Sequence, residues 1–178
     1  AFPEMSPSWE MLLSIIAVLS MFVGNLGAIM QTNIKRMLAF SSVSHAGYIL
    51  MAVIAKSSLG SSSMLFYMLT YAFMTFGIFG IIIVLGRKGE ENLEIKNYSG
   101  LAYKHPVIAL SMTIFLLSLG GLPPFAGFVA KFYLFSAAIQ EGLLTLVIIA
   151  VLNSAISFYY YLKVVVFMYM KEPEAEFN

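Results

Sequence analysis

Three basic side chains lie within long apolar stretches of this sequence: Lys131, His45 and Lys163. A charge is costly in such surroundings, so ionisable residues there are functional candidates by default. The protonation of a lysine responds strongly to desolvation, and an imidazole titrates near neutral pH and can pass a proton between its two nitrogens. These residue types predict the uptake and release of protons inside an apolar environment.

Lys131 follows a segment that should interrupt a helix, "LSLGGLPPFAGFVAKF" (117–132). The apolar stretch 107–140 would be about 50 Å long as one straight helix, which exceeds a single membrane crossing. Proline lacks the N–H that a helix needs, and glycine permits non-helical backbone. We therefore predict a half-helix over about 107–119, a short unwound link, and a second half-helix from residue 124 onward. The residues assigned to the break are Gly120, Gly121, Pro123, Pro124 and Gly127.

Lys131 and the break have a common explanation. Irregular backbone at membrane depth is tolerated only where it is buried in protein or lines a water-filled cavity, and ion-coupled transporters use such broken helices repeatedly. In this interpretation the unwound turn admits polar groups or water, and Lys131 uses them to take up or release a proton. The alternative is a structural lysine that pairs with a carboxylate of another subunit.

His45 and Lys163 each have a second interpretation. His45 is either a proton-carrying group or a neutral core histidine that hydrogen-bonds to a neighbouring helix. Lys163 lies about two turns from the end of its apolar segment, so it either snorkels towards the cytoplasmic side or joins a proton path. Tyr159, Tyr160 and Tyr161 are interpreted as packing or interface anchors, with a proton relay as the alternative. No second histidine, cysteine or acidic residue lies close enough to His45 in the sequence to suggest a metal site.

The composition assigns these residues to a membrane protein. Of 178 residues, 60% are hydrophobic and 11% are charged, whereas about a quarter of an ordinary soluble domain is charged. A soluble domain of this length could not bury so much apolar surface. The net charge of +1 argues against a nucleic-acid partner, and the absence of cysteine excludes disulfides and thiolate metal sites. We expect an integral membrane protein in contact with the lipid bilayer.

The charged residues divide the chain into five apolar segments, each near or above the ~20 residues that cross a bilayer. Backbone in lipid must satisfy its own hydrogen bonds, so these segments should be helices. The expected fold is an all-α transmembrane five-helix bundle with one broken (discontinuous) helix, in a single domain over 1–178. The predicted spans are 9–31, 37–55, 63–85, 107–140 (broken near 119–124) and 143–170.

The distribution of basic residues predicts the orientation of the bundle. Lysine and arginine concentrate on the cytoplasmic side of membrane proteins. With five spans, only Lys56 falls on one side, so the loop 87–105 should be cytoplasmic and the N-terminus outside. The seven basic residues on the cytoplasmic side are Lys35, Arg36, Arg87, Lys88, Lys96, Lys104 and Lys171.

Long blocks of the sequence resemble a known family. "QTNIKRMLAFSSVSHAGYIL" (31–50) and "LSLGGLPPFAGFVAKFYLF" (117–135) are similar to the antiporter-like membrane subunits of respiratory complex I. Within that family, "SSVSHAGYILMAV" and "SAISFYYYLKVVVFMYMKEP" (154–173) most resemble the N subunit of the bacterial NADH-quinone oxidoreductase and its plastid counterpart. The blocks occur in the family's order and cover nearly the whole chain.

The resemblance implies subunits built from two inverted five-helix repeats, each with a broken helix. This chain resembles the second repeat, helices 9 to 13, so we expect half of an inverted-repeat antiporter-like fold and a fragment of a longer chain. Lys131 matches the lysine of broken helix 12, at the end of the channel that exchanges protons with the outer side. His45 matches a histidine on the central hydrophilic axis. The glutamate and two lysines of the first repeat, and a final helix, have no counterpart here.

The implied function is that of a proton-translocating membrane subunit of NADH-quinone oxidoreductase in a bacterial inner membrane. The chain itself should carry no redox chemistry, catalytic residue, metal or cofactor; NADH, FMN, iron-sulfur clusters and quinone are expected in other subunits. Its partners should be other membrane subunits of complex I, including adjacent antiporter-like subunits. Two alternatives stay open: a subunit of a multi-subunit cation/proton antiporter, and a non-transporting scaffold, against which the charge of Lys131 counts.

Overall fold

The computed structural model describes residues 7–86 and 93–172, which are almost entirely helical. Within these ranges no β-strand forms, and the one β-bridge joins Asn33 to Glu94. The predicted all-α fold is confirmed. The elements are α1 (Pro7–Ile29), α2 (Ile34–Ile54), α3 (Ser58–Leu85), the 3₁₀ turn η1 (Ile95–Tyr98), α4 (Leu101–Lys104), α5 (Pro106–Gly120), α6 (Ala126–Gln140) and α7 (Leu144–Met170).

Side-chain caps begin α2 and α3. The Asn33 side chain accepts a hydrogen bond from the N–H of Arg36 (3.1 Å) at the start of α2. The Ser57 hydroxyl accepts one from the N–H of Gly60 (3.0 Å) at the start of α3. Such caps satisfy N–H groups that have no partner within the helix. Short connections follow α1 and α2, so the first three helices are antiparallel neighbours.

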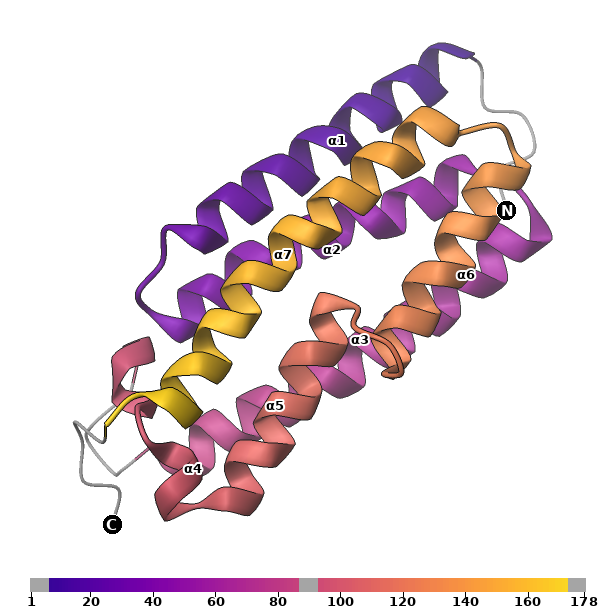
Figure 1. Cartoon of the computed structure of the whole chain (residues 1–178). Coiled ribbons are helices and arrows are strands. Elements are labelled where there is room, and N and C mark those ends of the chain that lie inside the picture. Colours follow the sequence, from indigo (N-terminus) through magenta and orange to yellow (C-terminus); the bar gives the residue numbers. More distant parts are fainter. Residues whose placement is uncertain (1–6, 87–92, 173–178) are drawn as a thin grey trace.

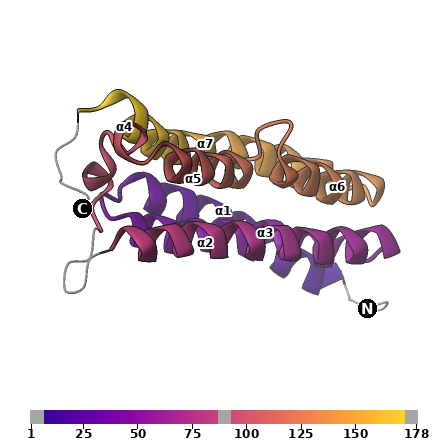
Figure 2. The same ribbon diagram turned by 90° about the horizontal axis from the view of Figure 1, so that it is seen from below.

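The helices pack in two layers along a common long axis (Figures 1 and 2). One layer contains α1, α2 and α3, and the other contains α5, α6 and α7. In the second layer α5 and α6 lie end to end beside α7, with the break between them near mid-length (Figure 1). Across the layers α3 contacts both half-helices, and α2 contacts α6 and α7. Residues from several helices therefore meet at the break.

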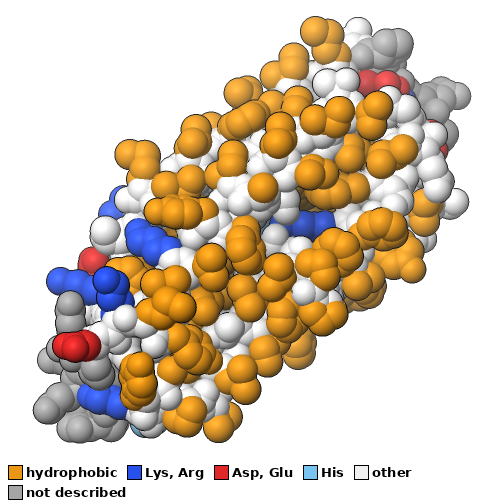
Figure 3. Space-filling model, in the orientation of Figure 1, with side chains coloured by type: hydrophobic (Ala, Val, Ile, Leu, Met, Phe, Trp, Pro, Cys, Tyr) orange, Lys and Arg blue, Asp and Glu red, His pale blue; other side chains and the backbone are white. Residues whose placement is uncertain are grey.

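The surface is that of a membrane protein. The helices α1, α2, α3 and α7 are long and apolar enough to cross a bilayer. The helices α5 and α6 have 15 residues each and are about 22 Å long, so each covers only part of the ~30 Å hydrocarbon core. Apolar side chains cover most of the face in Figure 3. Large ones such as Leu69, Phe76 and Val107 are more than 70% exposed, which suits contact with lipid or other membrane helices.

Helix α3 is longer than the membrane span predicted within it. It begins at Ser58, before the predicted span of 63–85, and serines of its first turns are satisfied within the helix. The hydroxyl of Ser63, for example, donates to the carbonyl of Gly60 (2.9 Å). Serine can bond to the helix backbone in this way, so it does not end the helix here.

The helix break also differs slightly from its predicted position. The non-helical residues are 121–125, and the second half-helix begins at Ala126 rather than at Pro124. The N–H of Phe125 donates to the carbonyl of Leu122 (3.0 Å). This bond closes a turn through both prolines, so the helix starts only after that turn.

The core consists of two apolar clusters, one towards each end of the bundle. Tyr98, Leu101 and Met112 belong to the first, and Tyr48 and Leu134 belong to the second. Polar side chains are also buried within the described part of the chain, and they supply the candidate site. They are Asn25, Ser41, Ser44, His45, Ser63, Ser99, Ser118, Lys131, Asn153 and Ser157.

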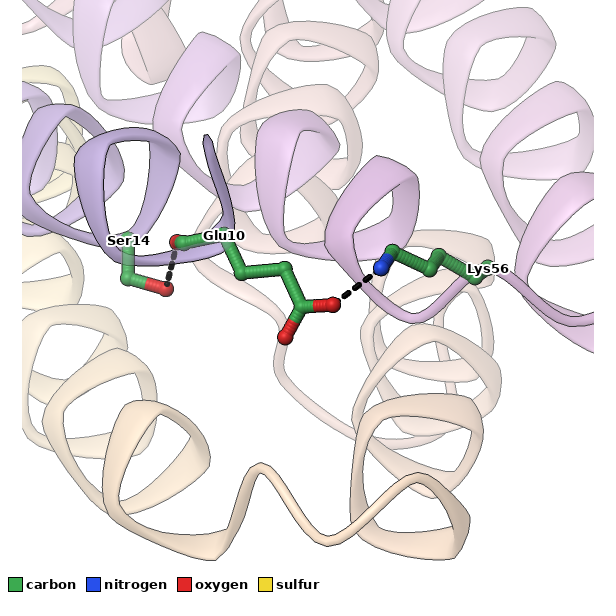
Figure 4. A network of polar contacts seen from close by, with 3 residues as sticks. All are labelled: Glu10, Ser14 and Lys56. Carbon is green, nitrogen blue, oxygen red and sulfur yellow. Dashed lines mark hydrogen bonds and ion pairs between the residues drawn. The ribbon is translucent and has the colours of Figure 1, made fainter. Parts of the chain in front are cut away.

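Polar contacts hold neighbouring segments together at each end of the bundle. At one end Lys56, between α2 and α3, forms an ion pair with Glu10 of α1 (Figure 4). The backbone carbonyl of Glu10 also accepts the hydroxyl of Ser14 (2.8 Å). At the other end, backbone hydrogen bonds join the segment 93–104 to α2 and α7. This segment closes the end at which most of the basic residues gather.

Candidate proton site at the helix break

The side chain of Lys131 is buried at the junction of α5 and α6. It is 4% exposed, and its Nζ donates to the carbonyls of Leu119 and Gly120 (both 3.1 Å). A third partner, the hydroxyl of Ser154 on α7, lies 2.8 Å from Nζ. A lysine ammonium has three N–H donors and no acceptor. Three oxygen atoms thus match its three donors, and the site can hold a charged lysine away from water.

The break supplies the carbonyls that Lys131 uses. The last carbonyls of a helix lack an intrahelical partner and lie at its partially negative end. Gly121 has a left-handed conformation (φ 84°), and its N–H donates to the carbonyls of Leu117 (3.1 Å) and Ser118 (3.0 Å). The next two carbonyls remain for the lysine. A Cβ at residue 121 would lie 3.0 Å from Cδ of Lys131, so this turn also needs glycine for space.

The two half-helices approach each other most closely at Gly127. Its N–H donates to the hydroxyl of Ser118 on α5 (3.0 Å). A Cβ at residue 127 would overlap the backbone carbonyl of Ser118. Glycine is therefore required here, because any side chain would push α6 away from the end of α5.

His45 on α2 lies between two tyrosine hydroxyls. Its Nδ1 is 2.6 Å from the hydroxyl of Tyr67 on α3, and its Nε2 is 3.1 Å from the hydroxyl of Tyr161 on α7. The Tyr161 hydroxyl is also 2.7 Å from the hydroxyl of Ser41. A neutral imidazole donates through one nitrogen and accepts through the other. This arrangement is a continuous chain of hydrogen-bonding groups across three helices.

His45 and Lys131 line one narrow cavity, together with Tyr67 and Ser118. The cavity has no room for a water molecule. The ring of Tyr48 lies close to both groups: its centre is 5.2 Å from Nζ of Lys131 and 5.9 Å from the centre of the imidazole. Within the described contacts, no hydrogen bond joins Lys131 to His45 directly.

A second and larger hollow also reaches Lys131. It has a volume of about 410 Å³ and lies between the break and α7, where Ser154, Phe128, Phe132 and Phe158 line it. Figure 3 shows basic side-chain atoms at the middle of this face, between α7 and the α5–α6 junction. Lys131 therefore lines both the narrow cavity of His45 and a hollow on the surface of the chain.

Lys163 is separate from this group of residues in the described contacts. Its Nζ lies 3.4 Å from the carbonyl of Gln31, just beyond the C-terminal end of α1. The end of a helix attracts positive charge, so this contact is typical of a lysine with a structural role. The structure brings Lys131 and His45 together and leaves Lys163 near one end of the bundle.

Two of the three consecutive tyrosines on α7 are buried and use their hydroxyls in hydrogen bonds. Tyr159 is exposed, but Tyr160 and Tyr161 are buried. Tyr160 donates to the side-chain oxygen of Asn25 (3.0 Å), and Asn25 in turn donates to the backbone and side-chain oxygens of Asn153 (2.9 and 3.0 Å). Tyr160 and Tyr161 therefore pack in the interior and also belong to buried polar networks.

Several residues of the site were missed in the sequence. Ser154, Tyr67 and Asn153 lie in ordinary helical segments. Their spacing in the sequence gives no sign that Ser154 contacts Lys131, that Tyr67 contacts His45, or that Asn153 contacts Asn25. Asparagine in an apolar segment is costly unless it is hydrogen-bonded. That cost is the one signal that could have identified Asn25 and Asn153.

Comparisons of the sequence and of the structure with known proteins find the same kind of protein. A family model described as NADH:quinone oxidoreductase/Mrp antiporter, TM, matches residues 1–157. NADH-quinone oxidoreductase subunit N of Trichlorobacter lovleyi is 54% identical over all of this chain and 37% of that protein. A chain of respiratory complex I from Thermus thermophilus with bound aureothin has a TM-score of 0.82 and 34% identity, covering 93% of this chain and 37% of that one.

A chain of the Mrp complex from Dietzia sp. is similar as well. It has a TM-score of 0.82 and 29% identity, and the match covers 96% of this chain and 32% of that one. The sequence described here spans about a third of the length of each of these proteins.

Proposed function

The chain belongs to the NADH:quinone oxidoreductase/Mrp antiporter transmembrane family, and we propose that it is the proton-translocating part of a membrane subunit of an NADH-quinone oxidoreductase. The observation that carries this proposal is the buried Nζ of Lys131 at a helix break, where it faces two backbone carbonyls and a hydroxyl. The 54% identity to a subunit N supports this complex as the assembly.

Lys131 is the group that takes up and releases the proton. The carbonyls at the end of α5 stabilise the ammonium without neutralising it. A nearby negative charge favours the ammonium, and a nearby positive charge favours the amine. Quinone reduction elsewhere in the complex changes the charges along the membrane arm, and Lys131 loads or releases a proton in response.

His45 is the next group along the path. Its two nitrogens face tyrosine hydroxyls on different helices, so a proton that reaches one nitrogen can leave from the other. The narrow cavity that His45 and Lys131 both line is a point of control in this proposal, because it has no room for a water molecule and must widen or rearrange before a proton passes. Lys163 stays a candidate for the path, although its contact with the carbonyl of Gln31 supports a structural role.

Redox chemistry belongs to other subunits in this proposal. Those subunits hold NADH, FMN, iron-sulfur clusters and quinone, and the partners of this chain are the other membrane subunits of the complex, including adjacent antiporter-like subunits. The bacterial source of the Trichlorobacter lovleyi relative supports a bacterial inner membrane. The loop 87–105 is assigned to the cytoplasm on its charge; Arg87 and Lys88, which contribute to that assignment, lie outside the described residues.

A second candidate function is that of a subunit of a multi-subunit cation/proton antiporter. The match to the Mrp complex supports it, because its TM-score equals that of the complex I match. The two functions differ in their driving force. Addition of NADH to membrane vesicles drives proton uptake by the first, whereas a sodium gradient in the absence of NADH drives proton movement by the second.

Substitution of Lys131 in the assembled complex tests the proposal. We expect Lys131→Ala to abolish most of the proton pumping per electron, because the proton site is gone. Lys131→Arg should fail almost as badly, since a guanidinium keeps its proton at any physiological pH. The measurement is NADH-driven proton uptake in sealed vesicles, with assembly of the complex checked on native gels. Full pumping in Lys131→Ala would instead favour a scaffold.

A further inference from the structure

The three partners of Lys131 are not equivalent. The carbonyls of Leu119 and Gly120 can only accept hydrogen bonds, whereas the hydroxyl of Ser154 can donate or accept. Ser154 Oγ also lies 3.4 Å from the carbonyl of Gly120. Its proton therefore has two possible destinations, the carbonyl of Gly120 and the Nζ of Lys131, and the hydroxyl can rotate between them.

The two protonation states of lysine need different partners. An ammonium has three N–H donors, which match the two carbonyls and the Ser154 oxygen; the serine proton then points to Gly120. A neutral amine has two N–H donors and one lone pair. The two N–H groups can stay on the carbonyls, and the lone pair then requires a donor at the position of Ser154. If a carbonyl stood at that position, its oxygen lone pair would face the lone pair of the amine, and no hydrogen bond could form.

We propose that Ser154 is a positioning residue that lets Lys131 gain and lose its proton while Nζ stays in place. Rotation of one hydroxyl replaces a donated bond with an accepted one, so neither state leaves a buried polar atom without a partner. This inference rests on the proposed function, since it matters only if Lys131 exchanges a proton.

The other groups around Nζ cannot take this part. From α2, the ring of Tyr48 and the imidazole of His45 face it, and from α3 the hydroxyl of Tyr67 lines the same cavity. Both nitrogens of His45 and the hydroxyl of Tyr67 are already engaged with each other or with α7. From α5 the hydroxyl of Ser118 lines this cavity too, but it accepts the N–H of Gly127 (3.0 Å) and forms no hydrogen bond with Nζ. Among the described residues, Ser154 is the one hydroxyl within hydrogen-bond distance of Nζ.

The pH dependence of pumping tests the role of Ser154. In Ser154→Ala the ammonium loses an acceptor and the amine loses a donor, and bonds to charged groups are roughly twice as strong as neutral ones. The ammonium is therefore destabilised more, and the alkaline limb of NADH-driven pumping should move about half to one pH unit lower. Ser157→Ala is the matched control, because the Ser157 hydroxyl bonds within its own helix (2.6 Å to the carbonyl of Ser154).

A second pair of variants separates the hydroxyl from the shape of the side chain. Ser154→Thr keeps the hydroxyl, and Ser154→Val has nearly the same shape without it. We expect a normal pH profile in Ser154→Thr and a shifted one in Ser154→Val, and this pair carries the test if the alanine variant does not assemble. An unchanged profile in Ser154→Ala, or equal profiles in Ser154→Thr and Ser154→Val, would overturn the inference. Either result leaves the proposed function standing as long as Lys131→Ala fails to pump.

Discussion

A buried lysine loses its hydration and must form hydrogen bonds with protein groups instead. The kind of group decides how readily the lysine exchanges a proton. Here the partners of Lys131 are carbonyls and a hydroxyl, and no carboxylate of the described residues contacts it. A carboxylate would hold the ammonium firmly, whereas dipoles stabilise it more weakly. The structural alternative for Lys131, a pair with a carboxylate, would have to draw that carboxylate from elsewhere.

The tyrosines around His45 support a prediction at the same scale. Tyr67→Phe or Tyr161→Phe leaves one imidazole nitrogen buried without a partner, at a cost of about 1–3 kcal/mol. We expect either substitution to lower proton pumping per electron. Tyr48→Phe is the control, because its ring also packs against His45 but its hydroxyl is not one of the two that bond to the imidazole.

The measurement is NADH-driven proton uptake in vesicles, normalised to quinone reduction. Pumping equal to wild type in all three phenylalanine variants would remove His45 and its hydroxyl partners from the path. A neutral core histidine would then be the better interpretation.

At the scale of elements, the end-to-end packing of α5 and α6 depends on Gly127. The substitution Gly127→Ala adds a Cβ that overlaps the carbonyl of Ser118, and overpacking of this kind costs about 1–3 kcal/mol or more. We expect the assembled complex to melt at a lower temperature and to lose pumping, because α6 carries Lys131. Gly80→Ala is the matched control, since a Cβ there meets nothing within 4 Å.

Gly80→Ala should leave the melting temperature unchanged or raise it slightly, because alanine favours the helix more than glycine does. Thermal melting of the purified complex, followed by retention of NADH oxidation, distinguishes the two variants. A Gly127→Ala complex as stable and active as Gly80→Ala would show that the close approach of the half-helices is not needed.

At the scale of the whole molecule, the charges at the two ends of the bundle predict its orientation. Lys56 is paired with Glu10 at one end, so that end carries no excess of positive charge from this lysine. The opposite end contains η1, α4 and the ends of α2 and α7, with Lys35, Arg36, Lys96 and Lys104 among them. Basic residues favour the cytoplasmic side, so we predict that this end faces the cytoplasm.

Cysteine labelling tests this orientation directly, because the chain contains no cysteine of its own. Lys96→Cys should react with an impermeant thiol reagent only from the cytoplasmic side. Glu141→Cys, at the opposite end after α6, should react only from outside. A cysteine at Glu91, which lies outside the described residues, should behave like the one at Lys96. The reverse pattern would mean that the bundle is inserted in the opposite orientation, and labelling of both cysteines from one side would mean that the number of crossings is wrong.

The sequence by itself determined the class of the protein, its long helices and the existence of a break beside Lys131. These features depend on composition and on neighbours within a few residues, such as the glycines and prolines of 117–132, so a single chain records them. The same local reasoning misplaced the start of α6, because the N–H of Phe125 closes a turn through both prolines that residue type alone does not specify.

Only the tertiary structure decided which polar groups meet. The contacts of Lys131 with Ser154, and of His45 with Tyr67 and Tyr161, join different helices. Each contact depends on how a helix is rotated about its axis and how far it is shifted against its neighbours. Packing of the whole bundle sets those two quantities, and a helical pattern in one segment contains no information about the rotation of another.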